Sequence, residues 1–294
     1  MKPRRKDRQG FFFLSLALCA IVSMASAAEW KAVLVETIEG MDVPECVLPD
    51  PENGVFYVSN IGSPEGAYWD DDGKGFILKI DATDTAKITR WLEGTPEKRV
   101  DSPKGMCILD GWLYYTDNAR LMRVSLEDQS KLEEIPLPET QRLNDLATDG
   151  TAVYVSDTAL GCAYRVTPEG VHTRIQTPES VNGLTLAKGR MLGLSWDLHD
   201  IYTLDPEGKN PSEPWGLGEH FTALDGVEVL DDGHLIVSDF VGNKICIVEP
   251  DTKNVHTLVE IETPADIGLD RAAGLLYVPM FKKDSVAIFR LTKE

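Results

Sequence analysis

The sequence predicts an all-β fold, a six-bladed β-propeller, and three observations lead to this prediction. A polar residue stands directly before a short apolar run six times, at Glu45, Lys104, Asn144, Asn182, Asp225 and Asp266, which we call the anchor residues. The intervals between consecutive anchors are 59, 40, 38, 43 and 41 residues, close to the roughly 40–50 residues of a four-stranded blade. No segment of ten or more residues shows a convincing helical period.

The third repeat shows how each blade is expected to be built. Asn144 is followed by a turn at Gly150, by strands expected at 152–156 and 162–167, and by an outer strand at 171–176. Short β-rich runs that Gly, Pro and Asp interrupt at spacings of about ten residues are typical of an antiparallel meander. The fifth repeat follows the same scheme.

The last repeat predicts how the ring closes. It starts at Asp266 and ends with an apolar strand at 286–291, so it lacks an outer strand of its own. The segment 31–37 precedes the first anchor and belongs to no blade. We therefore expect 31–37 to supply the missing strand, because a closed ring leaves fewer sheet edges free to pair with other chains.

The first 27 residues are predicted to be an export signal. Basic residues come first, a mostly apolar stretch follows at 11–25, and Ala25, Ser26 and Ala27 offer small side chains for cleavage. The apolar stretch is shorter than the roughly 20 residues that a membrane span needs. We expect residues 28–294 to form a single propeller domain that is periplasmic or secreted and has no membrane span.

Charge excludes some partners, and cysteine use leaves two interpretations open. Without the signal the chain has 24 basic and 47 acidic residues, a balance that repels nucleic acid and anionic lipid. Cys46, Cys107, Cys162 and Cys246 remain after cleavage. A disulfide between Cys46 and Cys107 is conceivable in an exported chain, but small buried side chains are the favoured interpretation.

The wide first interval comes from an insertion around 62–75. It carries Tyr68, Trp69 and three consecutive aspartates at 70–72, which do not fit a calcium-loop pattern. The insertion is either a solvated acidic loop, which is the default, or a lid. A second recurring feature, Ser or Thr followed by Asp at 116–117, 156–157 and 238–239, is expected to cap turns.

The anchors predict a site as well as a fold. Innermost strands of a propeller line its axis, so residues at their starts converge at one end of it. Glu45, Asn144, Asn182 and Asp225 offer only oxygen ligands, which suit a hard divalent cation such as calcium. The alternative is that the anchors merely hydrate and plug the channel, with Lys104 and Asp266 forming an ion-paired ring around Glu45.

Four short motifs resemble those of a known family. They are Pro44-Glu45, Arg142-Leu143-Asn144-Asp145, Val181-Asn182-Gly183-Leu184 and Leu224-Asp225-Gly226. Together they resemble the regucalcin, or senescence marker protein, and gluconolactonase family of six-bladed propellers. The resemblance implies that Glu45, Asn182 and Asp225 bind the metal, that Asn144 contacts the ion or the substrate, and that Arg142 orients the substrate. Lys104 and Asp266 depart from the family pattern, and no histidine is an anchor; His199 is the nearest.

Two functions follow from this reading. The first is a metal-assisted hydrolase of a small-molecule lactone or ester, in which Asp225 is the general base, Asp266 a second candidate base, and Arg142 or Lys104 binds an anionic group. The second is a non-catalytic, calcium-stabilised propeller that binds a protein or glycan through Trp69, Trp196 and Phe281. Nucleophilic catalysis by Ser195 is disfavoured because its surroundings lack the second glycine of a nucleophile elbow.

Overall fold

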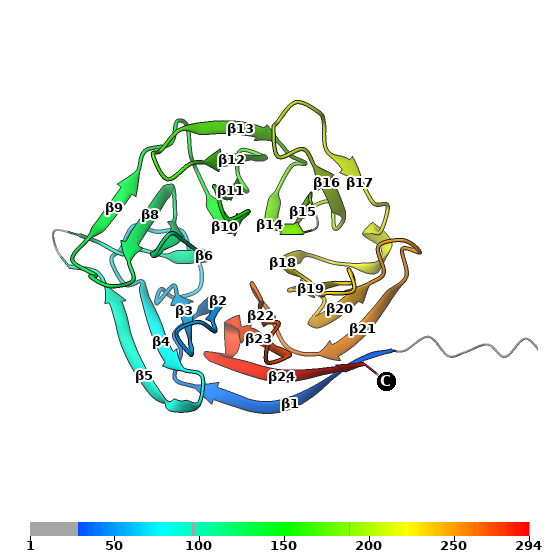
Figure 1. The fold of residues 1–294 in the computed structure, drawn as a ribbon, viewed down its shortest axis with the longest axis horizontal. Coiled ribbons are helices and arrows are strands. Elements are labelled where there is room, and N and C mark those ends of the chain that lie inside the picture. The colour runs from blue at the N-terminus through cyan, green and yellow to red at the C-terminus, as the bar shows by residue number, and fades with distance from the viewer. Residues whose placement is uncertain (1–28, 96–97, 188, 294) are drawn as a thin grey trace, which may run out of the picture.

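The computed structural model describes residues 29–95, 98–187 and 189–293. Six sheets of four antiparallel strands stand around a common axis, as Figure 1 shows. The prediction of an all-β, six-bladed propeller is therefore confirmed. The expected export signal, residues 1–27, lies outside the described residues.

Each blade runs from an innermost to an outermost strand. The innermost strands are β2 (Pro44–Asp50), β6 (Pro103–Leu109), β10 (Leu143–Thr148), β14 (Val181–Ala187), β18 (Leu224–Val229) and β22 (Gly268–Asp270). The second strands are β3 (Val55–Asn60), β7 (Trp112–Asp117), β11 (Val153–Asp157), β15 (Arg190–Ser195), β19 (Leu235–Asp239) and β23 (Leu275–Met280). The third strands are β4 (Phe76–Asp81), β8 (Arg120–Ser125), β12 (Cys162–Val166), β16 (Ile201–Leu204), β20 (Lys244–Val248) and β24 (Ser285–Lys293). The outermost strands are β5 (Asp84–Glu93), β9 (Leu132–Ile135), β13 (His172–Gln176), β17 (Glu213–Pro214), β21 (Val255–Glu260) and β1 (Trp30–Glu39).

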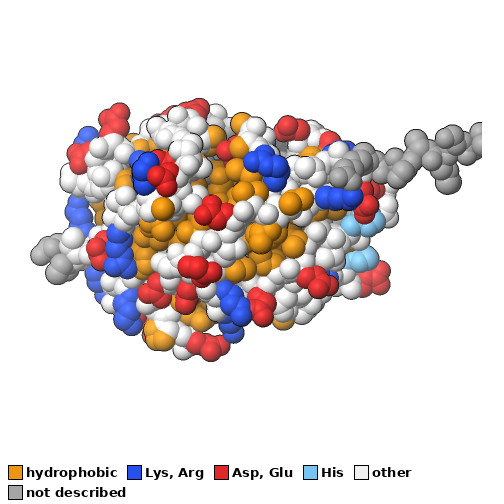
Figure 2. Space-filling model, turned by 90° about the horizontal axis from the view of Figure 1, so that it is seen from below, with side chains coloured by type: hydrophobic (Ala, Val, Ile, Leu, Met, Phe, Trp, Pro, Cys, Tyr) orange, Lys and Arg blue, Asp and Glu red, His pale blue; other side chains and the backbone are white. Residues whose placement is uncertain are grey.

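The N-terminal strand closes the last blade, as predicted. β1 pairs antiparallel with β24 from Trp30 opposite Lys293 to Glu39 opposite Ser285, so the two ends of the described chain lie side by side (Figure 1). As the outermost strand, β1 leaves Val33, Leu34 and Val35 more than half exposed. Figure 2 shows apolar side chains gathered on this edge of the ring.

Apolar cores fill the spaces between successive blades. One cluster joins Leu109 and Tyr114 of the second blade to Leu143, Val155 and Tyr164 of the third. This arrangement follows from sequence, because both faces of each blade's middle strands are apolar and must be covered by the neighbouring blade.

The four cysteines of the described chain are buried and unpaired. The conceivable disulfide between Cys46 and Cys107 is therefore not formed, and the interpretation as small buried side chains is confirmed. Burial raises the pKa of the Cys107 thiol and, with the nearby Asp266 carboxyl, also that of Cys46.

The helices in the described part of the chain are two single 3-10 turns, η1 (Gly218–His220) and η2 (Phe281–Lys283). Neither is long and apolar enough to cross a membrane.

Candidate functional site

The six anchors occupy equivalent places at one end of the propeller axis. Five are the second residue of an innermost strand, and Asp266 lies two residues before β22. All six are buried, with exposed fractions between 2% for Lys104 and 8% for Asn144. The backbone N–H of Asp266 donates to the carbonyl of Glu45 at 2.9 Å, which joins the last blade to the first. We call this set the anchor ring.

Each of the first five innermost strands has the same irregularity at its anchor. Pairing with the second strand skips the anchor and the residue after it, so that two residues oppose one. The skipped pairs are 45–46, 104–105, 144–145, 182–183 and 225–226. A bulge of this kind bends the strand and changes the direction of its side chains. Each of these five anchor side chains therefore departs from the regular alternation of the strand.

In the third and fifth blades, a Ser and the Asp after it hold the bulge in place. The Oγ atoms of Ser156 and Ser238 accept the N–H of the second bulged residue, Asp145 at 2.9 Å and Gly226 at 2.7 Å. The carboxylate of Asp239 accepts three backbone N–H groups, two of which lie just before β18. The predicted capping role of these pairs is thus confirmed, and it also fixes the anchors.

Glycine after the anchor lets the innermost strands come close together. A Cβ at Gly183 would lie 2.1 Å from the carbonyl oxygen of Asp225, and one at Gly226 would lie 2.6 Å from the backbone nitrogen of Ile267. Such separations are too short for any side chain. The third blade has Asp145 in this position instead, which puts one more carboxylate next to the axis.

Glu45, Asp225 and Asn182 interact with one another. Burial, and then the carboxylate of Asp225, raises the pKa of Glu45 well above its ordinary value, while Lys104 opposes this rise. Burial and the charge of Asp145 raise the pKa of Asp225 to about 7, although a hydrogen bond with the Asn182 amide works in the other direction. Without a counter-charge, these acids resist ionisation in their buried ring.

Among the residues that the structure describes, two oxygen atoms of this group find no hydrogen-bond partner. They are Oε2 of Glu45 and Oδ1 of Asn182, and both are buried. An unpartnered buried acceptor is costly, and a cation that two such oxygens coordinate would remove the cost. Within the described ranges, no group of three or more His, Cys, Asp or Glu side chains is arranged to hold a metal. A metal site here would thus need amide oxygens in addition to the carboxylates of Glu45 and Asp225. The sequence predicts this combination of ligands.

A second carboxylate pair joins the anchor Asp266 to Asp145, a residue to which the sequence analysis gave no role in the site. Asp145 hydrogen-bonds Asp266 and accepts the N–H groups of Leu146 and Leu184, each at 2.6 Å. Burial raises the pKa of Asp145 to about 7. Burial, and then the charges of Asp145 and Glu45, raises the pKa of Asp266 well above its ordinary value. The raised pKa makes the protonated form of Asp266 easier to populate, so Asp266 suits a proton donor as well as the base that the sequence predicts there.

A cavity of about 220 Å³ lies between the innermost strands, beyond the anchors. Asp145, Asp266, Cys46 and Cys107 line it, together with Glu228, whose carboxylate pairs with Arg271 at 2.8 Å. The ring is thus backed by a polar space along the axis.

The insertion, which we call loop 61–75, covers the other side of the ring. The carbonyl of Tyr68 accepts hydrogen bonds from Nζ of Lys104 at 3.0 Å and from Oγ of Ser102 at 2.6 Å. The Trp69 ring lies 3.9 Å from the same Nζ and 5.3 Å from Cζ of Arg142. Although Asp70, Asp71 and Asp72 are exposed, the loop is docked, so the lid interpretation is favoured over a solvated loop.

Lys104 holds this loop. Its ammonium donates to the Tyr68 carbonyl and also to the carbonyl and hydroxyl of Ser102, at 3.0 and 2.8 Å. All three N–H bonds therefore have acceptors within the protein. Burial lowers the pKa of Lys104 to about 8, against the attraction of Glu45. In this conformation Lys104 has no donor left for the anionic substrate group that we expected it to bind.

The predicted substrate residues Asn144 and Arg142 lie on the same blade. Asn144 is buried in the ring, and Arg142, one residue before β10, is exposed beside Trp69. The backbone N–H of Arg142 donates to Asp157 at 3.1 Å, which fixes its position. His199 is only half-buried, in the turn between β15 and β16, and is not part of the ring.

Comparison with known proteins establishes the fold alone. No family model and no curated protein matches the chain. A virginiamycin B lyase from Staphylococcus aureus superposes with a TM-score of 0.60 and 14% identity over 90% of this chain and 100% of that one. A protein of unknown function from Bacteroides thetaiotaomicron gives 0.66 and 13%, over 90% and 76%. A streptogramin B lyase gives 0.60 and 14%, over 91% and 98%.

Proposed function

We propose that the protein is an exported hydrolase of the lactonase or esterase type that depends on a divalent cation, with calcium as the expected ion. The observation that carries this proposal is the pair of unpartnered buried oxygens, Glu45 Oε2 and Asn182 Oδ1, beside the carboxylate of Asp225. Carboxylate and amide oxygens suit calcium, which takes 6–8 oxygen ligands and would leave positions for water or substrate. The resemblance to gluconolactonases supports the same ligands.

The chemistry divides between the ion and the side chains. A bound divalent ion would polarise a carbonyl oxygen and stabilise the negative charge that develops there. Asp225, buried in the ring with Glu45 and Asn182, would accept the proton of the attacking water, and Asp266, whose pKa burial raises, would return one to the leaving group. Asn144 and Arg142 orient the substrate, and loop 61–75 keeps bulk water away.

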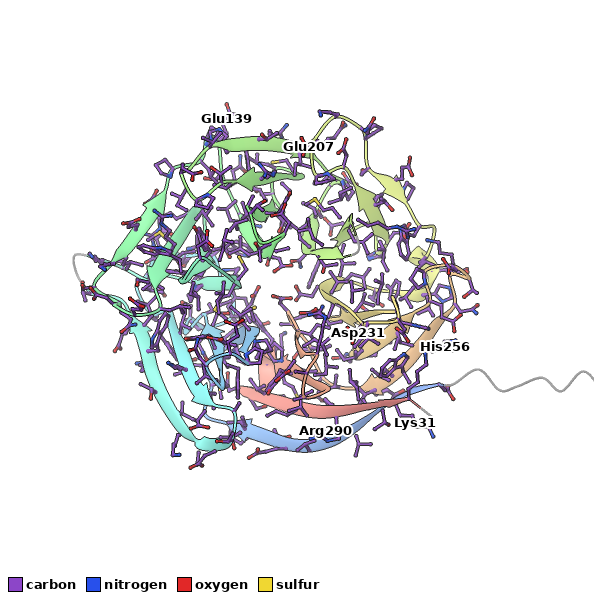
Figure 3. The ribbon with its side chains drawn as sticks, viewed as in Figure 1. Lys31, Glu139, Glu207, Asp231, His256 and Arg290 are labelled. Carbon is purple, nitrogen blue, oxygen red and sulfur yellow. The ribbon has the colours of Figure 1, made fainter. Side chains whose placement is uncertain are left out.

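Metal content and hydrolysis test this proposal. Purified residues 28–294 should retain about one divalent ion per chain by elemental analysis, and should hydrolyse at least one member of a panel of lactones and aryl esters. Asp225→Asn should reduce turnover by roughly a hundredfold or more, whereas Glu207→Gln, at the outer rim in Figure 3, should not. A preparation that holds no metal and hydrolyses nothing with calcium, magnesium, manganese or zinc contradicts the proposal.

The alternative is a non-catalytic, calcium-stabilised propeller that binds a protein or glycan. The closed loop 61–75 and the burial of all six anchors favour it. In that case the half-buried Trp69 and Trp196 would be contact residues, whereas Phe281, the third residue expected in this role, is buried and would support the surface from beneath. Asn182→Ala and Asp225→Ala would then abolish the rise in melting temperature with calcium, yet the folded variants would still bind their partner.

A further inference from the structure

The face over the anchor ring has an apolar side. Four aromatic residues from successive blades touch one another in a line: Trp196, Phe240, Phe281 and Tyr68. Their ring centroids are 5.4, 5.3 and 4.9 Å apart along that line. Each follows the second strand of its blade, which runs antiparallel to the innermost strand, so all four lie at the end of the axis where the anchors are. We call these residues the aromatic arc.

Exposed aliphatic side chains extend this arc. Leu198, two residues after Trp196, is 38% exposed, and Val241, next to Phe240, is 50% exposed. Tyr68, Trp196 and Phe240 are themselves half-buried, while Phe281 is buried beneath them. Exposed apolar side chains that border a buried polar centre are typical of a surface that binds a ligand.

The opposite side of the same face carries one exposed cation, Arg142. Arg142 is exposed, and within the described residues its guanidinium makes no hydrogen bond or ion pair, only the contact with Trp69 at 5.3 Å. Lys104, on the neighbouring blade, is already saturated by Tyr68 and Ser102. Arg142 is therefore the group on this side that is free to bind an anion, and its planar fork suits a carboxylate.

We propose that the site takes an amphipathic anion, with an aryl or alkyl body against the aromatic arc and a carboxylate on Arg142, in preference to a polyhydroxylated sugar derivative. This inference rests on the proposed function, which puts the scissile carbonyl at the anchors. Apolar rings gain free energy when they cover the arc. The hydroxyl groups of a sugar would lose water there without finding hydrogen-bond partners.

Calorimetric titration of the calcium-loaded protein tests the preference with three product-like probes: 4-phenylbutyrate, gluconate and the neutral 4-phenylbutanol. The expected result is that 4-phenylbutyrate binds about tenfold or more tightly than gluconate, because only it can cover the arc with a ring. It should also bind roughly fivefold more tightly than the alcohol, because the guanidinium lies at the surface, where an ion pair is weak.

Two variants test the contributions of Arg142 and of the aromatic arc separately. Arg142→Gln should reduce binding of 4-phenylbutyrate to the level of the alcohol and leave the alcohol unchanged, while Arg290→Gln, at the outer rim in Figure 3, should change neither. Leu198→Ser should weaken both aryl probes. Because Leu198 is exposed, this variant tests the arc without removing a core side chain.

Equal or tighter binding of gluconate, or an Arg142→Gln protein that still prefers the acid to the alcohol, overturns the inference. The proposed function is judged separately, from hydrolysis of a carboxylated phenyl ester and of a sugar lactone. If the aryl acid is preferred but neither ester nor lactone is cleaved, the proposed function fails and the inference stands. If both are cleaved equally well and gluconate binds as tightly, the inference fails and the function stands.

Discussion

At the scale of single residues, the site is a balance between buried acids and the charge that compensates them. Glu45, Asp145, Asp225 and Asp266 are all buried around one axis, and Lys104 is the cation that opposes the charge of Glu45. Protons neutralise this group at low pH. A divalent cation would do the same at high pH, and this exchange makes the ring testable through stability as well as through activity.

The first prediction concerns pH. The pKa values of Asp145 and Asp225 are about 7 in the folded protein, compared with about 3.9 in an unfolded chain. Between these values the folded state binds protons that the unfolded state does not, so these groups stabilise the fold below about pH 4, and their contribution is lost as pH rises to 7. The melting temperature of chelator-treated protein should fall over this range.

Calcium supplies the control for that experiment. With saturating calcium the melting temperature should decline less between pH 5 and 7, because the ion replaces the protons that are lost. A melting temperature that rises with pH in chelator, or a calcium effect that is larger at pH 5 than at pH 7, would contradict this account of the ring.

The second prediction separates repulsion from ligation. Glu45→Gln removes a carboxylate that repels Asp225, so the metal-free variant should melt at a higher temperature than the metal-free parent. The same change removes a charged ligand and should weaken calcium binding by about tenfold or more. Titration calorimetry and melting in chelator measure the two effects, with Glu207→Gln as the matched surface control. Loss of stability without loss of calcium affinity would mean that Glu45 has a structural role only.

The positions of the anchors follow from the sequence, but their interactions do not. Spacing alone places Glu45, Asn182 and Asp225 at equivalent points of successive innermost strands. Lys104 donates its hydrogen bonds to Tyr68 and Ser102. These bonds depend on how loop 61–75 folds back over the ring, and no local sequence pattern predicts that path. Asp145 belongs to one of the four motifs, but the motif does not reveal that its carboxyl group hydrogen-bonds that of Asp266.

At the scale of secondary-structure elements, the bulges decide where the anchors point. They are hard to predict because a bulge adds one residue without breaking the apolar pattern on either side of it. The paired Ser and Asp were visible in the sequence as turn caps. Their second role, in which Ser156 and Ser238 hold the bulged backbone, requires the observed register.

The third prediction concerns loop 61–75. Lys104→Met keeps an unbranched side chain of similar length but removes the hydrogen bonds to Tyr68 and Ser102 and the contact with Trp69. Loop residues Tyr68–Asp72 should then exchange their amide hydrogens roughly ten times faster, while strand amides stay protected. Lys244→Met removes a comparable hydrogen bond, to the carbonyl of His220, and should leave the loop unchanged. Unaltered exchange in the Lys104 variant would show that other contacts hold the loop, such as the hydrogen bonds from Asn118 and Arg99 to Asp70 and Asp71.

At the scale of the whole molecule, closure of the ring depends on one strand. β1 is the outermost strand of a blade whose other three strands come from the opposite end of the chain. Trp30 and Ala32 of β1 also pack on the apolar cluster that the fifth and sixth blades share. The sequence predicts this closure because segment 31–37 belongs to no blade and the last repeat lacks an outer strand.

The fourth prediction tests closure directly. Deleting 29–39 should expose the free edge of β24 and part of that cluster, and should produce a protein that melts at a much lower temperature and associates. A circular permutant provides the control. Because Trp30 lies opposite Lys293, a short hairpin can join these residues, with new ends in the exposed segment between Asn210 and Pro211. The permutant keeps every strand of the sixth blade, so it should melt close to the parent and remain monodisperse by size exclusion. If the deletion variant behaves as well as the permutant, β1 contributes a covering strand but not the closure of the ring.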